Sequence, residues 1–135
     1  MAWTGVKGTF NTALDRLDQP PPPAAALVGT WVTVDPDGQG IERLVLTDAG
    51  GTLTVQAYGA CQPAPCDWGV VRGHTYAAAV DAKEAVAFSA AYSFEFKTAL
   101  LTGFLRGHLL VLDCFNAFCA GDSRSDYHWR GVYAR

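Results

Sequence analysis

Few side chains of this 135-residue chain have acid–base chemistry near neutral pH, and its three histidines lack the spacing of a metal-binding pair. The chain also has no phosphate-binding glycine loop, dinucleotide fingerprint or serine nucleophile elbow. A lone imidazole or carboxyl group in an aromatic cavity would still have a shifted pKa and could act as a general acid or base. We take His74 and Glu95 as the catalytic candidates, although strand alternation places Glu95 on an outer face and allows His74 to contact solvent.

Aromatic residues offer a second kind of site, a cavity walled by rings. Alternation along 85–97 and 126–134 predicts two strands that each present an aromatic face, and it puts Lys97 on the opposite, outer face. Rings with hydrogen-bonding tips suit a flat apolar or aromatic ligand, but the same rings can also fill a dry core. The ligand-binding candidates are Trp31, Tyr58, Trp68, Tyr76, Phe88, Tyr92, Phe94 and Trp129.

The four cysteines form two pairs of equal spacing, Cys61 with Cys66 and Cys114 with Cys119. Two prolines can fold the loop between the first pair to disulfide distance, and reduced thiols are the alternative in a cytoplasmic protein. A four-cysteine zinc site is disfavoured, because five residues of straight strand span about 16 Å and zinc pairs use tighter spacings. We therefore expect no metal, no cofactor, and buried thiols packed as small apolar groups.

Composition excludes several classes of function. Ten basic residues face 13 acidic ones without a basic cluster, which argues against nucleic acid as a partner. No apolar run approaches the roughly 20 residues that span a bilayer, and the first 26 residues lack the apolar segment of a signal peptide. The composition is 50% hydrophobic and 17% charged, which favours a packed core. We expect a cytoplasmic protein that contacts neither nucleic acid nor membrane.

Four consecutive prolines at 20–23 divide the chain into two parts, because they forbid helix and supply no ladder donors. Apolar residues at helical spacing predict an amphipathic helix over 3–18, with its stripe at Trp3, Val6, Phe10, Leu14 and Leu17. We therefore expect an arm and stiff spacer at 1–26 and one domain at 27–135.

The domain at 27–135 shows short runs rich in Val, Leu, Thr, Tyr and Phe, separated by turn residues. Strands are expected at 27–34, 41–47, 52–59, 68–77, 85–97, 99–106, 108–118 and 126–134. Short links imply antiparallel neighbours, and closure removes both exposed sheet edges. The prediction is an all-β, eight-stranded antiparallel up-and-down barrel, with a sandwich as the alternative.

Gly29, Thr30 and Trp31 lie on the first predicted strand, and Arg130 and Arg135 lie at the last. Closure would bring these ends together, so that a guanidinium covers the indole and seals one barrel end. On these residues the sequence resembles the calycin superfamily of lipocalins, fatty-acid-binding proteins and avidins, with Arg130 as the matching basic residue. The resemblance implies a barrel that binds a small, mostly apolar ligand, but not biotin, because the biotin-contacting pattern of avidins is not recognisable.

A second resemblance rests on residues 58–69, which read Tyr-Gly-x-Cys-x4-Cys-Asp-Trp-Gly, together with Gly-Thr-Trp and an Asp-Pro turn. This pattern is similar to an uncharacterised bacterial barrel domain, which offers no function to carry over.

The predicted strand at 108–118 is apolar on both faces, so its outer face needs a cover. A second copy of the chain, giving a homodimer, is the simpler expectation, and the N-terminal helix is the alternative. For function, the sequence favours binding of a small apolar or aromatic molecule inside the barrel. The alternatives are a cyclase- or isomerase-type enzyme that templates a reactive substrate, and a scaffold working through its helical arm.

Overall fold

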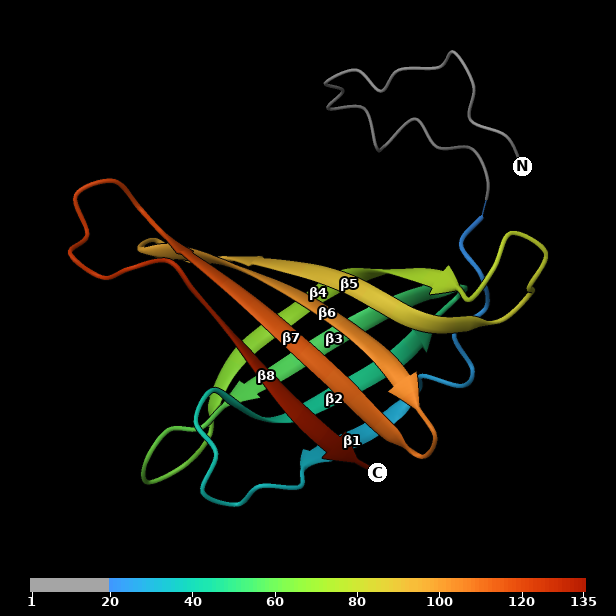
Figure 1. Cartoon of the computed structure of the whole chain (residues 1–135), viewed down its shortest axis with the longest axis horizontal. Helices are drawn as coiled ribbons and strands as arrows, with labels where there is room; N and C mark the ends of the chain where they lie inside the picture. The colour runs from blue at the N-terminus through green and yellow to red at the C-terminus, as the bar shows by residue number, and fades with distance from the viewer. Residues whose placement is uncertain (1–19) are drawn as a thin grey trace, which may run out of the picture.

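The computed structural model describes residues 20–135, which form one sheet of eight antiparallel strands (Figure 1). The strands are β1 Gly29–Thr33, β2 Ile41–Ala49, β3 Thr52–Gly59, β4 Cys66–Ala77, β5 Ala85–Ser93, β6 Lys97–Arg106, β7 Leu109–Phe118 and β8 Tyr127–Ala134. This confirms the predicted fold class and strand order. The predicted helix at 3–18 lies outside the described residues. No helix within the described part of the chain is long and apolar enough to cross a membrane.

The sheet closes into a barrel in which each strand pairs with its sequence neighbours. Pairing of β1 with β8 completes the closure through a short register, with Val32 opposite Ala134 and Thr33 opposite Tyr133. The structure therefore excludes the alternative of a two-sheet sandwich. Its up-and-down order is compatible with a calycin-like barrel, and closure removes the edges that an open sheet would expose.

The two ends of the barrel differ in what covers them. One end, which we call the plugged end, carries the 20–28 segment and the short turns before β3 and β7 (Figure 1). The other end, which we call the mouth, carries the longer loops 34–40, 60–65 and 119–126 and the 94–96 turn (Figure 1).

The 20–28 segment docks on the plugged end. The carbonyl oxygen of Pro22 accepts a hydrogen bond from Thr75 Oγ1 at 2.7 Å, and that of Pro23 accepts one from the Ala85 amide at 3.0 Å. Leu27 is fully buried in the core. The last prolines of the predicted spacer therefore contact the barrel.

A clasp around Trp31 completes the plugged end. Its indole is fully buried and donates from Nε1 to the Leu27 carbonyl oxygen at 2.9 Å. The Arg135 guanidinium carbon lies 4.5 Å from the ring centroid, and Nη1 donates to the carbonyl oxygens of Ala26 and Val28 at 3.0 and 2.8 Å. A guanidinium thus covers the indole, as expected from the sequence, but it comes from Arg135.

Inward-facing side chains fill the barrel interior. The fully or almost fully buried core includes Leu44, Leu46, Leu53, Val55, Ala57, Phe88, Leu101, Leu110, Leu112, Cys114 and Tyr133. Gly103 makes room for the Phe88 ring, which a Cβ atom at that position would overlap. Because protein interiors pack at nearly crystalline density, this part of the lumen is occupied by the protein itself.

Two tyrosines expected in the lumen lie on the outer wall. Tyr58 alternates with inward residues of β3, and its ring lies 4.1 Å below the Arg43 guanidinium carbon. β4 has a register shift where it pairs with residues 56–58 of β3. Trp68 lies at the shift and Thr75 after it, and both face inward although one number is even and the other odd. The bulge reverses the parity of β4, so Tyr76 points outward and is 46% exposed.

Candidate functional site at the mouth

Aromatic rings line one side of the mouth. Trp68 on β4 meets Tyr92 on β5 edge to face, with ring centroids 5.4 Å apart, and meets Phe94 in the same way at 5.3 Å. Phe94 in turn stacks on Phe96 with a centroid distance of 5.9 Å. Trp68 and Phe94 pack against the core while remaining partly exposed, so their rings are available to a bound molecule.

Lys97 enters the mouth because the chain turns where the sequence predicts a continuous strand over 85–97. β5 ends at Ser93 and β6 begins at Lys97, and the 94–96 turn between them is closed by the Phe94 amide donating to the Lys97 carbonyl oxygen at 2.8 Å. The turn contains neither glycine nor proline, so no residue type marks it. Lys97 therefore follows the inward alternation of β6, and its predicted outward orientation is wrong.

The Lys97 ammonium lies among three aromatic rings and one amide. Nζ donates to Asn116 Oδ1 at 2.8 Å. It lies 5.2 Å from the Trp68 ring centroid, 5.8 Å from that of Phe94 and 5.9 Å from that of Phe96. Such cation–π contacts hold a cation over ring faces, and their strength grows as water is removed.

Asn116 is 3% exposed, and its side chain is only half satisfied. Because an ammonium has donors only, Oδ1 must face Lys97, which fixes Nδ2 on the other side. Among the described residues, this buried Nδ2 has no hydrogen-bond partner. A buried donor without a strong acceptor costs about 1–3 kcal/mol, and this atom faces the packed interior on the side of Asn116 away from Lys97.

The neighbouring Cys114 thiol does not remove that cost. Burial raises the pKa of Cys114 to about 11, although Lys97 and the Asn116 amide act to lower it. The thiol is therefore protonated at neutral pH, and a neutral sulfur is a weak acceptor.

Partial burial changes the environment of the Lys97 amine. Burial lowers its pKa, the Arg124 guanidinium acts in the same direction, and Cys114 opposes them. The lowered pKa reflects the loss of water from around the ammonium.

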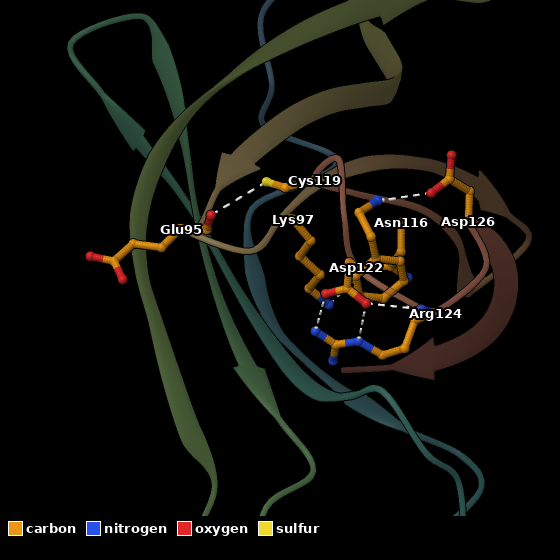
Figure 2. Close-up of polar contacts among 8 residues, drawn as sticks. Glu95, Lys97, Asn116, Cys119, Asp122, Arg124 and Asp126 are labelled. Atoms are coloured by element: carbon orange, nitrogen blue, oxygen red, sulfur yellow. Dashed lines mark hydrogen bonds and ion pairs between the residues drawn. The ribbon is translucent and has the colours of Figure 1, made fainter.

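The 119–126 loop shapes the rim beside Lys97 (Figure 2). Arg124 Nη2 lies 2.8 Å from Asp122 Oδ2, and the guanidinium carbon lies 4.4 Å from the Phe118 ring centroid and 5.1 Å from that of Phe96. The Cys119 amide donates to the Phe96 carbonyl oxygen at 3.0 Å, which ties this loop to the 94–96 turn.

A groove of about 510 Å³ runs between the 34–40 loop and β8, on the opposite side of the mouth from Trp68. Its lining includes Tyr127 and Trp129, and Trp129 also packs against the core. The indole lies directly over Gly40, where a Cβ atom would come within 2.7 Å of the ring and where φ is +93°. Glycine at this position therefore allows Trp129 to form a wall of the groove.

The structure divides the predicted ligand-binding residues among three places. These are the mouth and its groove (Trp68, Phe94, Trp129), the buried interior (Trp31, Phe88, Tyr92) and the outer wall (Tyr58, Tyr76). The polar pair of Lys97 and Asn116 is absent from that prediction. One signal could have revealed Asn116, because it continues the otherwise apolar inward alternation of β7.

The two predicted acid–base residues do not meet at the mouth. His74 is exposed on the outer wall, with its ring 4.8 Å from that of Tyr76. Glu95 is exposed in the 94–96 turn, where its backbone carbonyl oxygen accepts a hydrogen bond from Cys119 Sγ at 3.3 Å. The position of His74 follows from the parity reversal in β4.

On the outer wall, one carboxylate joins two basic side chains. Asp113 Oδ1 lies 2.7 Å from His128 Nε2 and 2.8 Å from Arg130 Nε, and Arg130 Nη2 donates to Oδ2 at 3.1 Å. The Arg130 hydrogen bond, together with that of His128, lowers the pKa of Asp113 against the effect of burial. Arg130 therefore binds Asp113 on β7 and does not cover Trp31, so its predicted place at the barrel end is wrong.

Part of the outer face of β7 is already buried within this chain. Val111 and Asp113 are each only 6% exposed, whereas Phe115 is 45% exposed and Leu109 is 39% exposed. The homodimer predicted from this face stays a prediction.

The cysteines behave as two different pairs. Cys61 and Cys66 form a disulfide with a Cα–Cα distance of 5.5 Å, which decides between the two alternatives left by the sequence. Cys114 is free and buried, and Cys119 is free and exposed. Within residues 20–135, no three His, Cys, Asp or Glu side chains cluster as a metal site would require.

No family model, curated protein or solved structure matches the chain. The calycin resemblance therefore stays a prediction, and a proposal about function has to rest on the mouth.

Proposed function

We propose that the protein is a small-molecule-binding barrel whose ligand lies at the mouth. The ligand is flat and largely apolar or aromatic, and it carries a hydrogen-bond acceptor. The observation that carries this proposal is the Lys97 ammonium, which lies beside the rings of Trp68 and Phe94 and donates to Asn116 Oδ1.

The packing of the interior favours the mouth over the deep lumen. Trp31, Phe88 and Tyr133 are at most 1% exposed and fill the barrel with their own rings. The partly exposed rings that a ligand can contact without unpacking the core are those of Trp68, Phe94 and Trp129. A pocket of partly exposed rings with a few convergent polar groups is the usual composition of a ligand site.

Binding is favoured over the cyclase or isomerase alternative. General acid–base catalysis needs a titratable group within hydrogen-bond reach of the reacting atoms. His74 lies on the outer wall, and Glu95 is an exposed turn residue. The mouth instead offers the Lys97 ammonium and aromatic surface, which suit holding a molecule. The scaffold alternative depends on the arm at 1–19, which lies outside the described residues.

The neutral fluorophore N-phenyl-1-naphthylamine tests the proposal, because its emission rises in an apolar site. We expect saturable binding that quenches tryptophan fluorescence. Phe94→Ala should weaken it about fivefold, since one aromatic contact is worth about 1 kcal/mol. Tyr76→Ala is the matched control, because this ring is 46% exposed on the outer wall.

Two results would contradict the proposal. One is the absence of saturable binding by the folded full-length chain. The other is an equal loss of affinity in Phe94→Ala and Tyr76→Ala, which would place the probe elsewhere.

A further inference from the structure

We infer that the mouth selects anionic ligands, specifically small apolar or aromatic carboxylates whose carboxylate lies against Lys97 Nζ. This inference rests on the proposed function and names the ligand class of the same site. It starts from a charge without a counterion.

Lys97 belongs to none of the ion pairs among the described residues. Among residues 20–135, the three ion pairs join Asp122 to Arg124 and Asp113 to His128 and Arg130, and none includes Lys97. Removing a cation from water is costly unless an opposite charge replaces the lost hydration. Nζ contacts one amide oxygen and three aromatic rings, which carry no net charge. An anion at the mouth would supply the missing counterion.

The donor geometry matches a carboxylate better than a neutral carbonyl. Lys97 has three ammonium protons, of which one is directed to Asn116 Oδ1. Carboxylate oxygens can accept the remaining protons, and charge-assisted hydrogen bonds are about twice as strong as neutral ones. An amide or ketone ligand would accept a hydrogen bond but leave the ammonium charge uncompensated.

The rings beside Lys97 fit the rest of such a ligand. The neighbouring Arg124 is paired with Asp122 and therefore adds no net charge. The apolar part of the ligand would contact the partly exposed rings of Trp68 and Phe94, which lie beside the ammonium. A small molecule with an aromatic body and one carboxylate fits both features.

A matched pair of probes separates charge from ring contact. The anionic dye 1-anilinonaphthalene-8-sulfonate and the neutral N-phenyl-1-naphthylamine share one ring skeleton and differ in the sulfonate. Displacement of the neutral dye by 1-naphthoate and by 1-naphthamide then tests a carboxylate against its neutral isostere. We expect the full-length chain to bind the naphthoate about tenfold more tightly than the amide, as a single additional charge-assisted contact would give.

Variants of Lys97 assign that preference to one side chain. Lys97→Met keeps the length and apolar character of the side chain, and should abolish the preference for naphthoate over naphthamide. Lys97→Arg keeps the charge and should retain most of the preference. Lys83→Met is the matched control, because Lys83 is exposed in the loop at the plugged end.

Asn116→Asp provides an independent test. It replaces the amide oxygen that lies 2.8 Å from Nζ with a carboxylate oxygen, and so supplies the counterion from within the protein. We expect this variant to lose the preference for naphthoate although Lys97 is still present. Thermal melts of each variant show whether the fold is retained.

The outcomes distinguish the inference from the proposed function. If the neutral dye binds at the mouth but naphthoate and naphthamide compete equally, the anion selectivity is refuted and the binding function stands. An unchanged preference in folded Lys97→Met or Asn116→Asp would refute it as well. If neither dye binds, the proposed function fails, and this inference fails with it.

Discussion

Trp31→Ala is the substitution that tests the plugged end most directly. The indole is fully buried beneath Arg135, and it donates to the Leu27 carbonyl oxygen at 2.9 Å. Alanine removes the ring, its hydrogen bond and the surface on which the guanidinium lies. Because the 20–28 segment is held partly through this clasp, the loss should affect both the core and the plug.

The expected loss of unfolding free energy is about 3–5 kcal/mol. A buried aromatic side chain removes about 150–250 Å² from water. At about 25 cal/mol/Å² this area corresponds to roughly 4–6 kcal/mol, which is an upper estimate because unfolded chains are partly compact. Large-to-small substitutions of aromatic residues in other cores cost about 3–5 kcal/mol. A domain of ordinary stability, about 5–15 kcal/mol, would be close to unfolding.

Urea denaturation followed by far-ultraviolet circular dichroism measures this loss without depending on tryptophan emission. Trp31→Phe keeps most of the ring but removes the indole donor, so its loss should be intermediate. Tyr76→Ala serves as the control, because a ring that is 46% exposed should cost less than about 1 kcal/mol. A loss below about 1 kcal/mol for Trp31→Ala, with an unchanged denaturant slope, would refute the role of Trp31 in closing the barrel.

Three further substitutions test other parts of the barrel. Asp113→Asn should cost about 1–2 kcal/mol near pH 7. Hydrogen bonds from Arg130 lower the folded pKa of Asp113 below 3.8, so the stabilisation is present above about pH 4 and is lost as the pH falls through the lowered pKa. An equal cost of Asp113→Asn in urea melts above about pH 4 and below the lowered pKa would contradict the ion pair. Gly103→Ala should cost about 1–3 kcal/mol by thermal melting, because its Cβ would overlap the Phe88 ring, and a neutral result would mean that the ring is free to move. Tyr92→Phe should cost about 1–3 kcal/mol in the same assay, because its hydroxyl joins three backbone groups of β3 and β4, and a loss below about 0.5 kcal/mol would count against those bonds.

Local patterns were sufficient to predict the barrel. Alternation of apolar and polar residues reports on a strand with one buried face, and turn residues such as Asp48 and Gly50 report on where strands end. Both signals depend on neighbours in the chain, so the strand number, the strand order and the meander could be inferred from the sequence. The expectation that a basic residue covers Trp31 followed from closure of that meander, and the structure confirms it.

The tertiary structure decided which side chains share a site. A bulge in β4 turned Tyr76 outward, and an unmarked turn at 94–96 turned Lys97 inward. The physical reason is that side chains alternate with a period of two, so one added or turned residue moves every later side chain of the strand to the opposite face. Bulges and turns of this kind depend on contacts between residues distant in the chain, which local alternation does not report. The sequence therefore determined that this protein closes into a barrel, and the three-dimensional packing determined that Lys97 and Asn116 meet at its mouth.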